Sequence, residues 1–140
     1  MIRPHAACVV LLCALPAAAG AEAVWRVLPG GVEAVARGGP VGLGLGCGVE
    51  GPALWIETPV EEAGSWRFVV SMGACAADVC LLVPEPEGAI PALVDDLRRG
   101  RMALVETAGA APDEWTLLGE VPLAGSSRAI GQVLAACPFP

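Results

Sequence analysis

The sequence predicts a small α+β domain in which an antiparallel β-sheet or sandwich carries two helices in its C-terminal half and is stapled by disulfides. Three observations lead to this prediction. Several segments alternate apolar and polar residues with a period of two, which is typical of half-buried strands. Two later segments repeat apolar residues at helical spacing. The 140-residue chain also has six cysteines, and its N-terminus has the composition of an export signal, which favours disulfides.

The clearest predicted strand covers residues 65–72, where the even positions are apolar and most odd positions are polar. Residues 41–47 form another, with Gly42, Gly44 and Gly46 on the face opposite its apolar residues. Glycines on one face of a strand indicate the close approach of another backbone or of a bulky ring. Their spacing does not fit a Gly-x-Gly-x-x-Gly dinucleotide loop. Further strands are predicted at 24–28, 32–37, 54–58, 79–83, 101–107 and 115–123.

The first predicted helix covers residues 89–99. Its apolar residues repeat at helical spacing, Pro91 suits the first turn, and Gly100 suits the stop. Two arginines in the last turn complement the helix dipole, and Asp95 can reach them from the exposed side.

The second predicted helix covers residues 126–137. Ser126 or Ser127 can cap its start, and Pro138 ends it. Its apolar stripe includes Cys137, which we therefore expect to face the core.

Residues 1–21 are predicted to be a secretory signal peptide, because a short positive start precedes an apolar run and then small residues. Cleavage after Ala21 or Ala23 fits the small-x-small rule. The alternative is a buried helix at the start of a cytosolic domain. With the signal peptide removed, residues 22–140 form a single exported domain, periplasmic or secreted. We expect no membrane-spanning segment, because the apolar run of the leader is too short to span a bilayer and the rest of the chain has no run of 18 or more apolar residues.

Loss of the leader removes the one histidine, and the chain has no lysine or tyrosine. Without Arg3, seven arginines oppose fifteen acidic residues, a formal charge of −8. Missing histidine and lysine exclude Ser–His–Asp, Cys–His and Schiff-base catalysis, and an acidic surface disfavours nucleic acid. A two-carboxylate glycosidase is compatible with the residue types, but the acids lie mainly in predicted turns or on a polar helix face. We expect no enzymatic activity, no cofactor and no metal.

Four cysteines in the exported domain allow three pairings. Cys75 and Cys80 flank a segment that a tight loop between strands can close, which leaves Cys47 for Cys137. The long bridge would contribute about 4–5 kcal/mol and the short one about 2 kcal/mol in the chain-entropy model. A four-thiolate metal site lacks the Cys-x-x-Cys spacing. A redox role for Cys75 and Cys80 is a further alternative, although nothing near them in sequence lowers a thiol pKa.

Four motifs follow one another between Cys75 and Leu134: a paired-cysteine turn, an apolar helix ending in Leu-x-x-Gly, a strand, and a Pro-Leu-x-Gly segment before a final helix. In this order they resemble the invasion-associated locus B family of bacterial exported proteins. The final segment, with its closing Cys137, also resembles VasI-like periplasmic proteins associated with type VI secretion. The first half departs from the locus B pattern, since Cys47 stands where a pair is expected. The resemblance implies an envelope protein linked to host interaction and supplies no catalytic residue. The motifs fall at 75–80, 92–100, 102–105 and 121–130.

The resulting hypothesis is a non-enzymatic envelope protein of a Gram-negative bacterium that binds a protein in the envelope or host. Two alternatives are an inhibitor of a host enzyme such as lysozyme and a type VI secretion accessory protein. The predicted partner contacts are Trp55, Glu57, Glu61 and Glu62. Trp25 and Trp115 are further candidates, because tryptophan is enriched at interface centres, although each tryptophan could instead fill the core. The sequence specifies neither the partner nor the oligomeric state.

Overall fold

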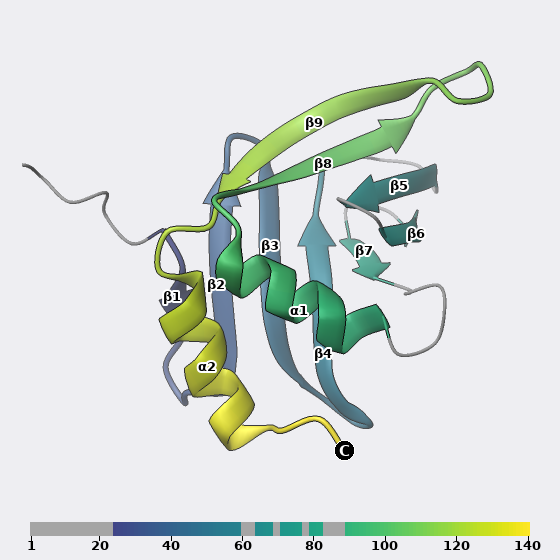
Figure 1. Ribbon diagram of the computed structural model, residues 1–140. Helices are drawn as coiled ribbons and strands as arrows, with labels where there is room; N and C mark the ends of the chain where they lie inside the picture. Colours follow the sequence, from purple (N-terminus) through teal and green to yellow (C-terminus); the bar gives the residue numbers. More distant parts are fainter. Residues whose placement is uncertain (1–23, 60–63, 69–70, 77–78, 83–88) are drawn as a thin grey trace, which may run out of the picture.

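The computed structural model describes residues 24–59, 64–68, 71–76, 79–82 and 89–140. Within them it has nine strands and two helices, arranged in a single antiparallel sheet with two helices against it (Figure 1). The predicted α+β class is therefore confirmed. In chain order the elements are β1 (Arg26–Val27), β2 (Glu33–Gly38), β3 (Val41–Gly48), β4 (Gly51–Glu57), β5 (Gly64–Phe68), β6 (Ser71–Ala76), β7 (Val79–Leu82), α1 (Ala89–Arg99), β8 (Met102–Ala108), β9 (Trp115–Pro122) and α2 (Ser126–Ala136).

The strand order in the sheet is β1-β2-β3-β4-β7-β6-β5-β8-β9, and every neighbouring pair is antiparallel. The sheet curves so strongly that β9, at its far end, returns to the turn between β2 and β3. A Cβ atom at Gly38 would overlap the carbonyl oxygen of Glu120. Gly38 therefore has to be glycine for the two ends of the sheet to approach each other.

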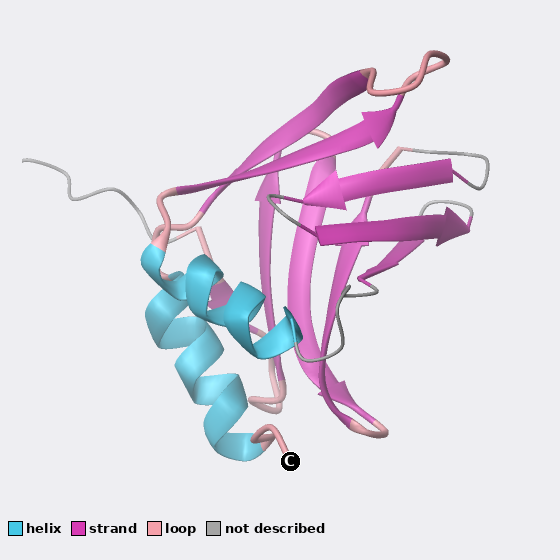
Figure 2. Ribbon diagram, turned by 45° about the vertical axis from the view of Figure 1, so that its right-hand side comes forward, coloured by secondary structure: helices cyan, strands magenta, loops and turns pink. Residues whose placement is uncertain are grey.

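Both helices lie on the same face of strands β1 to β4 (Figure 2). This inner face holds the core, because alternate strand residues point toward the helices and are removed from water. Within β5, Trp66 and Phe68 are fully buried as well. Among the described residues, the indole N–H groups of Trp25 and Trp66 are buried and have no hydrogen-bond partner. The largest fully buried side chains are Trp66, Phe68, Leu43, Leu45, Ile56, Leu97, Ile130, Val41, Val94, Val105, Val121 and Val133.

Helix α1 has the predicted bounds, and Asp95 pairs with Arg99 one turn later as expected. The predicted serine cap of α2 is wrong. Gly125 occupies the N-cap position with φ 83°, and no side chain caps the helix. The hydroxyl of Ser126 instead donates to the carbonyl oxygen of Leu97 at 2.7 Å, so this buried group joins the two helices.

The predicted strand 65–72 is wrong as a single element. Two strands, β5 and β6, pair with each other there, with Phe68 opposite Ser71. The remaining predicted strands and helices agree with the structure to within three residues at each end. The predicted leader, residues 1–21, lies outside the described residues. Among the described residues, neither α1 nor α2 is long and apolar enough to cross a bilayer.

The four cysteines among the described residues form one bridge and one unbonded pair. Cys75 and Cys80 stand opposite each other on β6 and β7 and form a disulfide, as predicted. Cys47 and Cys137 are thiols in the structure, so their predicted bridge is not formed there. Cys137 does not lie in the core, contrary to expectation, because it follows the last turn of α2 as its C-cap. Cys47 is exposed at the hairpin end of β3.

Candidate functional site

On the outer face of strands β2 to β4, the middle strand β3 carries glycines at positions 42, 44 and 46. Gly44 lies between Val35 on β2 and Trp55 on β4 in the strand register, and Val35 in turn lies beside Arg26 on β1. Because a glycine has no side chain, the middle of this row is lower than its two sides. The row therefore leaves a groove between β1 and the side chain of Trp55.

The indole of Trp55 covers the glycines. A Cβ atom at Gly44 would overlap its Cε2 and Cζ2 atoms, and one at Gly46 would lie 2.9 Å from Cζ3. The glycine pattern predicted the close approach of either another backbone or a bulky ring. The structure confirms the second, since the Trp55 ring occupies the space. The ring remains half-buried, so part of it faces the groove.

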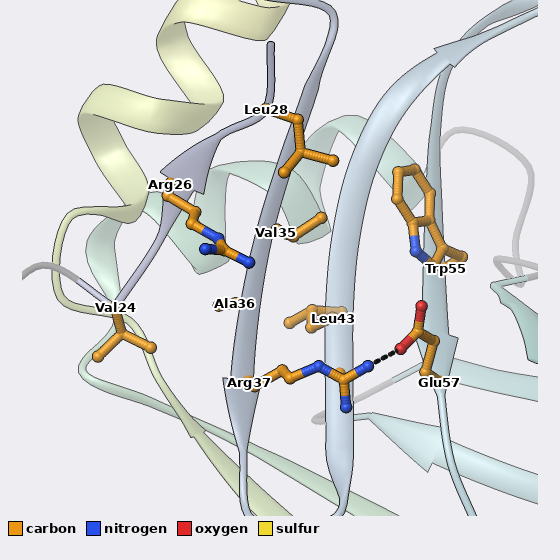
Figure 3. Close-up of a pocket in the computed structure, with 10 residues that line it drawn as sticks. Val24, Arg26, Leu28, Val35, Ala36, Arg37, Leu43, Trp55 and Glu57 are labelled. Atoms are coloured by element: carbon orange, nitrogen blue, oxygen red, sulfur yellow. Dashed lines mark hydrogen bonds and ion pairs between the residues drawn. The ribbon is translucent and has the colours of Figure 1, made fainter.

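The groove has a volume of about 430 Å³, within the size range of ligand pockets in proteins. One wall comes from the N-terminal segment and β1, and the other comes from β4 (Figure 3). The lining residues combine apolar side chains with two arginines and one glutamate. They are Val24, Arg26, Leu28, Val35, Ala36, Arg37, Gly42, Leu43, Trp55 and Glu57.

Arg37 and Glu57 close one end of the groove with an ion pair. They belong to β2 and β4 and reach each other across Gly42 on the strand between them. A side chain at Gly42 would meet the Glu57 carboxylate at 3.1 Å. The third charged group, Arg26, takes part in none of the ion pairs among the described residues. The groove therefore has an excess positive charge in a chain whose net charge is −7.

The groove supports binding better than acid–base chemistry. The Glu57 carboxylate is already engaged in the ion pair with Arg37. Within the described residues, no cluster of three or more histidine, cysteine or acidic side chains could hold a metal ion. What the groove offers a ligand is the half-buried Trp55 ring, the apolar side chains of Leu28 and Val35, and the guanidinium of Arg26.

Two of the four predicted contact residues, Trp55 and Glu57, lie in the groove. Glu61 and Glu62 lie outside the described residues. Trp25 is wrong as a surface candidate, because only 3% of it is exposed and it belongs to the core. Trp115 is half-buried, but Arg67 lies over its ring at 4.5 Å.

The sequence reasoning missed the two arginines of the groove. Their position on the outer face was predictable, since strand alternation places Arg26 and Arg37 on the face opposite the buried residues of their strands. The signal that was lacking is the register between strands, which the sequence pattern does not specify.

A second arginine–glutamate–tryptophan cluster lies on the other half of the sheet. Arg67 on β5 and Glu106 on β8 stand directly opposite each other and form an ion pair. The same Arg67 covers the Trp115 ring. Its cation therefore occupies the face of the ring that a ligand would use.

Comparisons of this chain with protein-family models, with curated proteins and with solved structures gave no match. The resemblance to the invasion-associated locus B family stays a prediction.

Proposed function

We propose that the protein is a non-enzymatic exported protein of the bacterial envelope, periplasmic or secreted, that binds a protein partner through the groove on the outer face of β1 to β4. One observation carries this proposal: a half-buried tryptophan that covers two glycines faces, across the groove, an arginine without an ion pair. Tryptophan and arginine are the residue types that most often dominate binding energy at protein interfaces.

The chemistry of the groove indicates which part of a partner it fits. Its volume accommodates a few side chains of an extended segment rather than a folded surface. Trp55 and Leu28 would contact an apolar side chain, and Arg26 would bind a carboxylate through paired hydrogen bonds. The proposed partner segment is therefore an extended peptide with an apolar residue next to an acidic one.

The absence of enzymatic activity is part of the proposal. Glu57 is paired with Arg37, and Glu106 with Arg67, so both carboxylates are already held in ion pairs. We expect the purified protein to turn over no hydrolase substrate and to give no insulin reduction. Turnover that is lost in Glu57→Gln would contradict this part of the proposal.

Crosslinking in living cells tests the binding role. The full chain is expressed in a Gram-negative host, crosslinked in the periplasm and purified, and the captured proteins are identified. We expect Trp55→Ala and Arg26→Glu to remove the captured partner. Trp115→Ala is the matched control, since its ring is already covered by Arg67, and it should retain the partner.

Two results would overturn the proposal. One is a capture no stronger than that of an unrelated exported protein. The other is an equal loss in Trp55→Ala and Trp115→Ala while both variants give native circular dichroism spectra, because the groove would then have no special part in binding.

A further inference from the structure

The two unbonded thiols lie together although they come from opposite ends of the domain. Cys47 is near the end of β3, and Cys137 is the C-cap of α2, where its N–H donates to the carbonyl oxygen of Val133 at 2.8 Å. The pKa of Cys47 is raised to about 11, chiefly because its thiol hydrogen-bonds to Cys137 and less because of desolvation and charge.

The chain after Cys137 leads to the same hairpin. Phe139 packs partly against the core, and Pro140 lies 3.3 Å from the position that a Cβ atom of Gly51 would occupy. Figure 1 shows the C-terminus beside the turn between β3 and β4. A hollow of about 800 Å³ lies between this hairpin, the start of α1 and the C-terminal residues. The position of the C-terminal segment therefore shapes one wall of that hollow.

We infer that Cys47 and Cys137 form a second disulfide in the exported protein, and that this bridge is a reversible tether between the C-terminal segment and the β3–β4 hairpin. The inference relies on the proposed export for its oxidant but not on the groove over Trp55. The pair is separated by about 90 residues, so the bridge would close most of the domain into one loop.

The reaction is a thiol–disulfide exchange with an oxidised dithiol protein of the envelope or with oxidised glutathione. One cysteine thiolate attacks the disulfide of the oxidant, which forms a mixed disulfide and releases one thiol of the oxidant. The second thiolate attacks the mixed disulfide and releases the other thiol. The pair loses two protons and two electrons, and the oxidant is reduced from a disulfide to two thiols.

The two bridges differ in their access to external thiols. Cys75 and Cys80 are 3% and 0% exposed, whereas Cys47 is exposed. Exchange requires that the attacking thiolate reaches a sulfur atom. External reductants should therefore open the Cys47–Cys137 tether first and leave the β6–β7 bridge closed.

Peptide mapping without reduction tests the pairing, and the absence of lysine makes the map simple. Trypsin separates Cys47 in residues 38–67 from Cys137 in residues 129–140, while Cys75 and Cys80 remain together in residues 68–98. We expect the exported full chain to yield 38–67 joined to 129–140. Either peptide joined to 68–98, or alkylation of both cysteines without prior reduction, would overturn the inference.

A second experiment separates the tether from export. Purified reduced protein is equilibrated with oxidised glutathione and mapped in the same way, so the result does not depend on the compartment. Recovery of an intact peptide 1–26 from cells would contradict export, whereas failure of the glutathione reaction to join 38–67 to 129–140 would overturn the tether itself. Neither result depends on whether a partner binds in the groove on the outer face of β1 to β4.

Graded reduction tests reversibility. Increasing glutathione should make Cys47 and Cys137 alkylatable at a concentration at least tenfold below that needed for Cys75 and Cys80. Hydrogen exchange at the amides of Cys137 and Phe139 should accelerate in the reduced protein and in Cys47→Ser, a variant that keeps the β6–β7 bridge. Opening of both bridges at the same concentration, or unchanged exchange at the C-terminal segment, would overturn the reversible tether.

Discussion

The two halves of the sheet carry the same residue types and differ in how they use them. Strands β1 to β4 hold the Arg37–Glu57 pair beside Trp55, and strands β5 to β9 hold the Arg67–Glu106 pair beside Trp115. In the first half a strand of glycines separates the arginine from the glutamate. In the second half the two charged residues are on adjacent strands and directly opposite each other.

This difference explains why the Trp55 ring faces a groove whereas the Trp115 ring is covered by an arginine. With glycine on the middle strand, the tryptophan lies down on the sheet and its upper surface remains available. Without it, the guanidinium moves over the ring, and the cluster becomes a closed contact of cation and aromatic face. The binding surface thus depends on the glycines of β3, which have no side chains and leave room for the Trp55 ring.

Adding a side chain to the glycines of β3 should have the largest effect. In Gly44→Val the new side chain would overlap the Trp55 indole and displace it. We expect a loss of about 1–3 kcal/mol in the free energy of unfolding, the usual cost of overpacking, together with loss of partner capture. Urea denaturation measures the first and crosslinking the second. Gly64→Val in β5 is the control, because nothing lies within 4 Å of its Cβ position, and it should stay within about 0.5 kcal/mol of the parent.

Removing the ring should have the next largest effect. Trp55→Ala exposes Gly44 and Gly46 to water, and we expect it to cost about 1–2 kcal/mol of stability, as for a half-buried aromatic side chain. Trp115→Ala loses chiefly its contact with Arg67, worth about 0.5–1 kcal/mol at an exposed site. If urea denaturation ranks the two variants in the opposite order, the glycines of β3 contribute less to the packing of Trp55 than the structure indicates.

The cysteine pairs sharpen the comparison through their reactivity. In the reduced protein the hydrogen bond of the Cys47 thiol to Cys137 raises the pKa of Cys47 to about 11, so little thiolate exists at pH 8. Cys137→Ala removes this cause, and the pKa should return toward 9.0. We expect Cys47 to be alkylated about tenfold faster at pH 8, since the gain in thiolate is partly offset by its lower nucleophilicity. A rate that does not change would show that the two thiols are not in contact.

The ion pairs should differ least. The side chains of Arg37 and Glu57 are 67% and 48% exposed, against 37% and 24% for Arg67 and Glu106. Arg37→Ala should therefore cost about 0.2–0.5 kcal/mol and Arg67→Ala about 1 kcal/mol, because exposed pairs are screened by water and salt. Urea denaturation at low and high salt measures both. Equal losses for the two variants would contradict the assignment.

The helices were predictable because their signals are local. Helix α1 begins and ends as the sequence indicates, since proline at its first turn, arginines at its last turn and Gly100 after it act within a few residues. The division of residues 65–72 into β5 and β6 was not predictable. Alternation shows which residues face the core, and no glycine, proline or asparagine marks the reversal of the chain between Phe68 and Ser71.

The candidate site was partly predictable for a similar reason. The glycines at 42, 44 and 46 indicated that something large lies against β3, but the sequence does not say that the ring belongs to Trp55 on the next strand. Cys47 continues the inward-facing positions of β3, yet it is exposed because it lies at the hairpin end of the strand. A face can be assigned from the period of two, whereas coverage of that face depends on where helices end.

The distribution of the four tryptophans makes intrinsic fluorescence a probe of the groove. With no tyrosine in the chain, ultraviolet emission comes from indole rings. Trp25 and Trp66 are in the dry interior, and Trp55 and Trp115 are at the surface. A dissolved quencher such as iodide can reach the second pair alone. A peptide bound in the groove would shield Trp55 from it, so binding can be followed by fluorescence without an attached label.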